Sequence, residues 1–261
     1  MQRVAGYFLL SCQEERMKLS DNTILVTGGG SGIGLALARE LARHDGNTVI
    51  ICGRNSQKLE AVHADYPAIA TLVCDIARDA EQEHLVTTVL QNYPNLNILI
   101  NNAGIQYSYD FSEGGKHADL IEEEANINFL SHAKLTDRLL PTLMQQQGAA
   151  IVNVTSALAV APKQSAPIYC AAKAAMHSFT KALRYQLENT AVKVFEIIPP
   201  LVDTEMTKGR GKSKISPETL AKEALQGIEA GKYEIRIKKT KLLFALHRLS
   251  PSLAERIIRN G

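Results

Sequence analysis

The segment from Thr23 to Gly34 reads TILVTGGGSGIG and decides the expected fold. It begins with a short β-rich run, Thr23–Thr27, and passes directly into the glycine-rich stretch Gly28–Gly34, after which a helical pattern starts. Glycines allow a tight turn and a close approach of the backbone, and the first turn of the new helix directs free N–H groups at a pyrophosphate. The order of strand, glycine loop and helix therefore predicts a dinucleotide-binding turn, for which a glycine-rich surface turn is the alternative.

The spacing of the glycines narrows this prediction. Counting from Gly28, the pattern GxGxxG would require a glycine where Ile33 stands, so the segment matches the variant TGxxxGxG. Gly28, Gly32 and Gly34 carry that spacing, and we expect Ser31 and Ile33 of the same loop to border the cofactor.

Outward from this loop, short apolar runs alternate with longer helical patterns, such as Ile33–His44, Asp79–Asn92 and Pro167–Glu188. Most of the runs are apolar throughout, as expected for parallel strands that are covered on both faces. We therefore expect one Rossmann-type α/β domain, a doubly wound parallel sheet of about seven strands with helices on both faces. The expected strands are Thr23–Thr27, Thr48–Cys52, Ile69–Cys74, Ile98–Asn101, Ala150–Thr155, Lys193–Ile198 and Glu234–Ile237.

The N-terminus is expected to lie outside this domain. Met17 precedes the first clear strand, so we assign residues 17–261 to the single NAD(P)-binding domain. Residues 1–16 are interpreted as an extension that is disordered or lies upstream of the native start. The apolar run Val4–Leu10 is short for the core of a signal peptide, which remains the alternative.

Composition and charge bound the function. The 261 residues are 45% hydrophobic and 21% charged, as in an ordinary globular protein, and no apolar run is long enough to span a membrane. Four cysteines without CxxC spacing suit reduced thiols in the cytoplasm, and the histidines show no metal-binding spacing, so no metal site is expected. From Lys208 onward 13 Lys and Arg face 5 Asp and Glu. We interpret this basic tail as a solvated face and expect no nucleic-acid partner.

The end of the second strand indicates which dinucleotide is bound. An acidic residue about 20 residues beyond the glycine loop normally receives the ribose 2′-hydroxyl, whereas an arginine favours a 2′-phosphate. Arg54 stands there and no carboxylate does, so NADP(H) is preferred over NAD(H); a solvated helix cap is the alternative for Arg54. Asp75 and Ile76 end the third strand at the same edge. Asp75 can accept from the adenine amino group, or it can simply start the next helix.

A proton-transfer pair is expected on the helix Pro167–Glu188. Ser165 can cap this helix, and Pro167 suits its first turn. Tyr169 and Lys173 lie four residues apart and therefore share a face. An ammonium ~4 Å from the phenol at an effective dielectric of ~20 would favour the phenolate by about 4 kcal/mol, or roughly three pKa units. Tyr169 is therefore expected to exchange a proton near neutral pH.

Ser156 completes the expected catalytic group. It ends the fifth strand, thirteen residues before Tyr169, at the carboxyl edge of the sheet where ligands bind in such folds. Its hydroxyl can hold the reacting oxygen beside Tyr169. A Tyr-x-x-x-Lys pair alone is common in solvated helices, and it is Ser156 with the glycine loop that makes the pair specific.

Taken together, TGGGSGIG, Asn101–Gly104, Ser156 and YCAAK at 169–173 resemble the short-chain dehydrogenases/reductases over nearly all of residues 17–261. The resemblance implies that Asn102, Ala103 and Gly104 border the cofactor. It also implies that Lys173 holds the nicotinamide ribose. Asn128 matches the helix asparagine that links a water molecule to the lysine in this family.

One departure follows the sixth strand, where Pro199-Pro200 replaces the family's usual Pro-Gly and stiffens the backbone beside the nicotinamide. Val202 and Thr204 still match the positions that touch the carboxamide and the phosphates. The Pro-Pro form and the tail pattern are similar to the DltE-like oxidoreductases within the family.

The residues beyond this loop concern the substrate and partners. The basic, glycine-bearing segment 206–216 suits a mobile lid, whose Lys208, Arg210, Lys212 and Lys214 either receive an anionic substrate or are simply solvated. Leucines at 242, 246, 249 and 253 form a helical stripe expected to pack on the domain or on a partner in a homodimer or homotetramer. Contact with a membrane surface is the alternative for this stripe.

The expected function is hydride transfer between nicotinamide and a carbonyl or alcohol of a small molecule. The complete set of Asn, Ser, Tyr and Lys favours it. A non-catalytic NADP(H)-binding sensor or scaffold is the alternative. Such proteins usually lose a catalytic residue, and none is missing here. Epimerases and enoyl reductases of the same family are disfavoured by the chain length and by the spacing of Tyr169 and Lys173.

Overall fold

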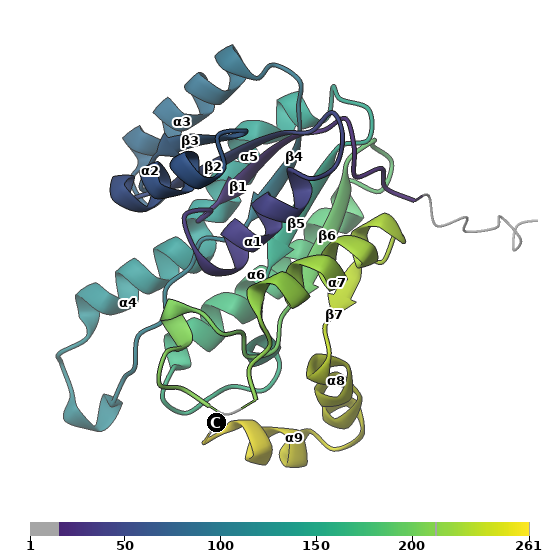
Figure 1. Ribbon diagram of the computed structural model, residues 1–261. Helices are drawn as coiled ribbons and strands as arrows, with labels where there is room; N and C mark the ends of the chain where they lie inside the picture. Colours follow the sequence, from purple (N-terminus) through teal and green to yellow (C-terminus); the bar gives the residue numbers. More distant parts are fainter. Residues whose placement is uncertain (1–15, 212, 261) are drawn as a thin grey trace, which may run out of the picture.

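A seven-stranded sheet forms the centre of the protein in the computed structural model, which describes residues 16–211 and 213–260. The strand order is β3-β2-β1-β4-β5-β6-β7, and each neighbouring pair is parallel. This confirms the predicted doubly wound sheet (Figure 1). The strands are β1 Thr23–Thr27, β2 Thr48–Gly53, β3 Ile69–Val73, β4 Leu96–Asn101, β5 Ala150–Val154, β6 Lys193–Ile198 and β7 Glu234–Arg236.

Helices connect the strands and lie on both faces of the sheet (Figure 1). The longest, α6 at Pro167–Gln186, carries the expected catalytic pair. The others are α1 Gly32–Leu41, α2 Ser56–Asp65, α3 Asp79–Asn92, α4 Ala118–Ala125, α5 Ser131–Leu143, α7 Pro217–Glu229, α8 Lys239–Leu249 and α9 Pro251–Ile258, with short turns at Phe111–Glu113, Asn126–Leu130, Ala157–Ala159 and Glu205–Thr207.

Two hydrophobic cores, one on each face of the sheet, are formed where the helices pack against the strands. Alternate residues of one strand enter different cores: Ile24 and Val26 of β1 pack with Leu37 of α1, whereas Leu25 packs on the other face with Leu139 of α5. All five of these side chains are at most 1% exposed. This is why the strands read as apolar throughout rather than as alternating.

The two ends of the chain differ in what can be described. Met17 is buried in the first core and its N–H bonds to Glu229 O at the end of α7, while residues 1–15 lie outside the described residues. The predicted extension at residues 1–16 therefore stays a prediction. At the other end, α8 and α9 form a helix pair (yellow in Figure 1) at the same end of the molecule as α4. Within the described residues, none of the helices could span a membrane.

One local prediction was wrong. Ser165 was expected to cap α6, but the N-cap is Ala166, and no side chain caps this helix. Pro167 occupies the first turn as expected, because its missing N–H would have no helical partner there. The helix that carries Tyr169 therefore starts with its backbone N–H groups unclaimed by a capping side chain.

Candidate active site

The glycine loop after β1 is shaped by contacts that leave no room for a side chain. A Cβ on Gly34 would lie 2.4 Å from the Gly28 carbonyl oxygen and 2.5 Å from Asn102 Nδ2. Gly28 has φ of +65°, and a Cβ there would lie 2.8 Å from Ala103 Cα. The spacing of TGxxxGxG is thus a steric requirement for bringing the loops after β1 and β4 together.

The start of α1 is open to an anion. Ser31 is the N-cap, yet its side chain makes no capping bond, and Leu35 N–H is the first to reach back to a carbonyl, that of Ser31. The N–H groups of the preceding turn have no helical acceptor and carry the positive end of the helix dipole. Ser31, Gly32, Ile33 and Gly34 therefore fit a bound pyrophosphate.

Thr27 joins the glycine loop to the loop after β4. Its hydroxyl accepts hydrogen bonds from the N–H groups of Asn102 (2.9 Å) and Ala103 (3.0 Å) and donates to Ile100 O (3.3 Å). The Asn102 amide in turn donates to Thr27 O at 2.9 Å. The structure thus places Asn102 and Ala103 against the glycine loop, with the Asn102 side chain used for support.

Two cations lie beyond the end of β2, where the sequence predicts the adenine ribose of the cofactor. Arg54 follows β2, is half exposed, and lies 3.3 Å from Glu123 of α4. Lys58, in the first turn of α2, pairs with Glu205 beyond β6. A Cβ on Gly30 would lie 3.5 Å from Lys58 Cβ, so Lys58 is beside the glycine loop. Sequence reasoning missed Lys58, although a second basic residue four positions after Arg54 was visible.

Asp75 and Ile76 lie at the neighbouring strand end, but their side chains are already engaged. Asp75 Oδ1 accepts from Ala77 N–H at 3.1 Å, but α3 begins at Asp79 with Arg78 as its N-cap, so Asp75 does not start that helix. Ile76 is buried in the second core, and its carbonyl accepts from Gln82 Nε2. Contact of either residue with adenine stays a prediction.

Ser156 and Tyr169 converge at the end of β5. Ser156 is buried, and its Oγ accepts from Leu158 N–H at 3.1 Å, which fixes the side chain at the start of a short turn. The Ser156 hydroxyl lies near enough to the Tyr169 phenol to act as a hydrogen-bonding group that lowers its pKa. The pair therefore presents two O–H groups to one point, which is what holding and protonating a carbonyl oxygen requires.

Lys173 lies one turn further along α6 and is 4% exposed. Its Nζ donates to Val154 O of β5 at 2.9 Å and lies 5.7 Å from the centroid of the Tyr169 ring. Burial lowers the pKa of this ammonium to about 8. Lys173 is thus held by the sheet and does not point its charge at the phenol oxygen.

The expected drop in the pKa of Tyr169 was wrong for this geometry. Burial raises the pKa of the phenol to about 12, and the hydrogen bond with Ser156 opposes the rise. Lys173 contributes little, because its Nζ is turned to Val154 O and its own pKa is lowered. Tyr169 therefore keeps its proton at neutral pH and is poised as a proton donor.

Asn128 lies in a single π-helical turn, Asn126–Leu130, between α4 and α5. Its amide bonds to both backbone groups of one residue, accepting from Ile105 N–H at 3.2 Å and donating to Ile105 O at 2.9 Å. A Cβ on Gly104 would lie 2.7 Å from Asn128 Oδ1 and 3.8 Å from Lys173 Nζ. Asn128, Gly104 and Lys173 are thus neighbours, as the resemblance implied, and the π turn is the local distortion that brings them together.

The segment after β6 returns to the glycine loop. Thr204 caps the turn Glu205–Thr207, and its methyl carbon lies 3.1 Å from the Cβ that Gly32 lacks. Val202 is buried in the first core and pairs with Ile215. Despite Pro199-Pro200, none of the described peptide bonds is cis, and Thr204 lies beside Gly32 of the glycine loop. Contact of Val202 and Thr204 with the cofactor stays a prediction.

Sequence reasoning also missed His132. This buried α5 side chain bonds through Nε2 to Ala103 O at 2.7 Å, which ties the loop after β4 to α5. Burial lowers the pKa of His132 to about 4, so the imidazole is neutral and donates from Nε2. A lone histidine in an apolar helix pattern gave no signal for this role.

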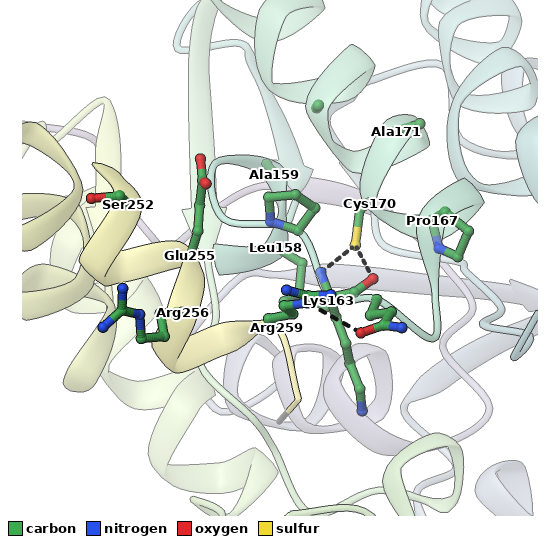
Figure 2. A pocket seen from close by; sticks show the side chains of 13 residues that line it. Leu158, Ala159, Lys163, Pro167, Cys170, Ala171, Ser252, Glu255, Arg256 and Arg259 are labelled. Carbon is green, nitrogen blue, oxygen red and sulfur yellow. Dashed lines mark hydrogen bonds between the residues drawn. The ribbon is translucent and has the colours of Figure 1, made fainter. Parts of the chain in front are cut away.

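A cavity of about 740 Å³ opens on a different side of α6 from the catalytic hydroxyls (Figure 2). Its wall joins the loop after β5 to α9, where Gln164 N–H bonds to Arg259 O at 3.0 Å. The Cys170 sulfur accepts from Lys163 N–H at 3.3 Å. Neither Ser156 nor Tyr169 lines this cavity, which lies between the loop after β5, the start of α6 and the end of the chain at α9. The lining residues are Leu158, Ala159, Pro162, Lys163, Gln164, Pro167, Cys170, Ala171, Ala174, Ser252, Glu255, Arg256 and Arg259.

Comparison with known proteins agrees with this arrangement. Residues 22–214 match the short chain dehydrogenase family, and the chain belongs to it. The uncharacterized oxidoreductase DltE of Bacillus subtilis (strain 168) is 45% identical over 225 residues, which cover 84% of this chain and 89% of that protein. The protein is therefore an oxidoreductase of this family, and the predicted similarity to DltE is confirmed.

Two solved structures share the fold. A short chain dehydrogenase from Burkholderia cenocepacia in complex with NADP is 22% identical, with a TM-score of 0.83 over 94% of this chain and all of that one. A 3-ketoacyl-(acyl-carrier-protein) reductase from Brucella melitensis complexed with NADH is 26% identical, with a TM-score of 0.76 over 82% and 94% of the two chains. Structural neighbours thus include complexes with both kinds of dinucleotide.

Proposed function

We propose that this protein transfers a hydride between NADP(H) and the carbonyl or secondary alcohol of a small molecule. The observation that carries the proposal is the meeting of Ser156 and Tyr169 hydroxyls at the end of β5, with Lys173 one turn away. This group lies across the sheet's switch point from the open helix start at Ser31. A bound nicotinamide would supply the hydride; the protein supplies position and the proton.

Each residue has a separate task in this proposal. Ser156 holds the carbonyl oxygen, and Tyr169 donates a proton to it as the alcohol forms. Lys173 holds the nicotinamide ribose. Asn128 shapes the π turn beside Lys173 and links the lysine to water.

The protonation state of Tyr169 supports reduction as the faster direction at neutral pH. A phenol with a pKa of about 12 can donate at once, whereas alcohol oxidation first needs its deprotonation. We therefore expect the rate of alcohol oxidation to rise with pH over the accessible range, while carbonyl reduction at neutral pH does not depend on that deprotonation.

The preference for NADP(H) over NAD(H) rests on the ribose end of the cleft. Arg54 stands where a carboxylate would receive the 2′-hydroxyl, and Lys58 adds a second cation beside Gly30. Both pair with exposed or partly exposed carboxylates, Glu123 and Glu205, and such pairs are weak enough to be exchanged for a phosphate.

We further propose a homodimer or homotetramer in the cytoplasm. The three cysteines of the described residues are buried free thiols, which suits a reducing compartment. Leu242, Leu249, Leu253 and Ile257 of α8 and α9 are exposed and offer an apolar surface to a second subunit. Light scattering after size-exclusion chromatography tests the assembly.

The function is tested with a panel of carbonyls and alcohols, followed by the absorbance of NADPH and NADH side by side. Replacing Tyr169 by Phe should lower kcat about 10³-fold and leave NADPH binding unchanged. Tyr185→Phe is the matched control, because Tyr185 is on the same helix and 68% exposed.

Three results would contradict the proposal. A preference for NADH would overturn the role of Arg54. Full turnover by the Tyr169→Phe protein would overturn the role of Tyr169 as proton donor. A wild-type protein that binds NADPH but reduces nothing, and whose cellular role survives the change of Tyr169 to Phe, would favour the sensor or scaffold instead.

A further inference from the structure

The segment beyond β6 forms a closed loop, which we call the lid: residues 201–215, of which 212 lies outside the described residues. Its two ends are pinned to each other. Val202 forms a parallel bridge with Ile215, Asp203 N–H bonds to Ile215 O at 2.9 Å, and Ile215 N–H bonds to Leu201 O at 3.2 Å. The lid therefore has a fixed base and projects its middle residues.

Arg210 stands at the tip of the lid between two glycines in the left-handed region. Gly209 has φ of +76° and Gly211 has φ of +56°. Arg210 N–H bonds to Thr207 O at 3.0 Å, which closes the turn. Such a turn presents one long side chain in a defined direction, and here that side chain crosses to the loop after β4.

The Arg210 guanidinium is anchored at Gln106. One nitrogen donates to Gln106 Oε1, and the other lies 3.4 Å from Gln106 O. Gln106 is two residues beyond Gly104, whose missing Cβ would lie 3.8 Å from Lys173 Nζ. Two residues of chain span at most ~7 Å, so the backbone of Gln106, which anchors the guanidinium, lies close to Lys173. The charge of Arg210 also acts to lower the pKa of Tyr169.

Arg210 forms no ion pair within the described residues: no carboxylate oxygen lies within 4.0 Å of its guanidinium, and its acceptors at Gln106 are neutral. Burial raises the pKa of Glu124 and the charge of Arg210 opposes this rise, but the two side chains do not pair. The other lid cation with a defined partner, Lys214, pairs with Asp203 at 3.2 Å. Glu124, buried nearby, already accepts from Tyr107 N–H and Tyr109 O–H. A guanidinium has five N–H donors, so several remain for an anion.

We propose that Arg210 binds a carboxylate of the substrate, so that the protein acts on short oxo acids and their hydroxy acids. This rests on the proposed function and names its substrate class. One guanidinium matches the single charge and planar oxygens of a carboxylate, whereas a phosphate dianion usually needs more cations. With its carboxylate at Arg210, such a substrate would have to present its carbonyl to Ser156 and Tyr169, whose phenol already feels the charge of Arg210.

The test compares two probes that differ only in charge, 4-oxopentanoate and 4-oxopentanamide. In the wild-type protein, kcat/KM with NADPH should be higher for the acid. Arg210→Gln should lower kcat/KM for the acid about 100-fold, mainly through KM, and leave that for the amide unchanged. Arg210→Lys should restore part of the loss. Lys208→Gln, an exposed lid cation, is the matched control and should change neither probe.

Binding separates this proposal from the proposed function. Calorimetric titration of 4-oxopentanoate into the protein saturated with NADP⁺ should show about 100-fold weaker binding for Arg210→Gln and no change for Lys208→Gln. Binding of the acid that depends on Arg210 but is never followed by turnover would sink the proposed function alone. Equal losses for acid and amide, no preference of the wild type for the acid, or weaker NADPH binding as the only effect would overturn the role of Arg210.

Discussion

The candidate site has two sides, which are built by opposite means: the cofactor wall, made by the loops after β1 and β4, and the catalytic wall, made by Ser156, Tyr169 and Lys173. On the cofactor wall, the loops after β1 and β4 fit each other backbone to backbone, and Thr27 satisfies the N–H groups of Asn102 and Ala103. On the catalytic wall, burial lowers the pKa of Lys173 to about 8 and raises that of Tyr169 to about 12. On the first wall the same contacts support the fold and the proposed cofactor site. On the second, the proposed function requires a buried cation, which destabilises the fold.

The largest effect on the cofactor wall is expected from the substitution Gly34→Ala. An alanine there would meet Gly28 O at 2.4 Å, so α1 must shift away from the loop. We expect NADPH affinity to fall about 100-fold, measured by fluorescence titration, with a loss of about 1–3 kcal/mol in stability. Gly30→Ala is the matched control, because its Cβ would meet Lys58 Cβ at an ordinary 3.5 Å. Equal behaviour of the two variants would contradict the steric argument.

Removing the Thr27 hydroxyl tests whether hydrogen bonds hold this wall together. Thr27→Val keeps the shape but leaves the N–H groups of Asn102 and Ala103 without an acceptor. We expect a loss of about 2 kcal/mol in the free energy of unfolding, measured with urea, and weaker cofactor binding. Thr27→Ser keeps the oxygen and should lose far less. A Val variant as stable as the wild type would show that water replaces the hydroxyl.

On the catalytic wall, we expect a substitution to raise the free energy of unfolding rather than to lower it. Because the pKa of Lys173 falls from 10.5 to about 8 on folding, the unfolded state binds more protons between these values, and stability rises with pH across that window. At neutral pH the folded state bears the full cost of about 3 kcal/mol. Lys173→Met also loses the bond to Val154 O, so we expect a net gain of about 1–2 kcal/mol together with loss of activity.

Urea unfolding at about pH 7 and about pH 10 measures this gain, which should shrink at the higher pH. Lys181→Met is the control on the same helix, since Lys181 is partly exposed and only 3.7 Å from Glu234 in a surface pair. It should change stability by less than about 1 kcal/mol at both pH values. A Lys173→Met protein that is less stable at neutral pH would remove the contrast between the walls.

The sequence was sufficient for features that depend on local pattern. Short apolar runs located all seven strands, and the spacing of Gly28, Gly32 and Gly34 located the glycine loop, in which Gly28 and Gly34 leave no room for a side chain. Ser156 and Tyr169 could be paired because Ser156 stands at the end of one strand and Tyr169 near the start of the helix that comes after it.

Features that depend on packing could not be predicted. The partner of Arg54 is Glu123, 69 positions away, and no local pattern encodes that pairing. The pKa of Tyr169 was misjudged because burial of the phenol, which a local pattern does not show, raises it. The Lys173 ammonium, expected to oppose this, is bonded to Val154 O on β5. Arg210 looked like any of four basic lid residues until its anchor at Gln106 was seen, 104 positions earlier in the chain.

The π turn at Asn126–Leu130 also fixes the length of the chain at that point. An added residue in a continuous helix rotates everything beyond it by about 100°, so α4 and α5 are two helices out of phase along one axis. This offset lets Glu124 and Asn128 bond to the segment after β4, at Tyr107 and Ile105, while Leu135 and Leu139 pack against the sheet. Loops on the surface tolerate a lost or gained residue, but here one residue fewer would turn one of these two faces away from its target.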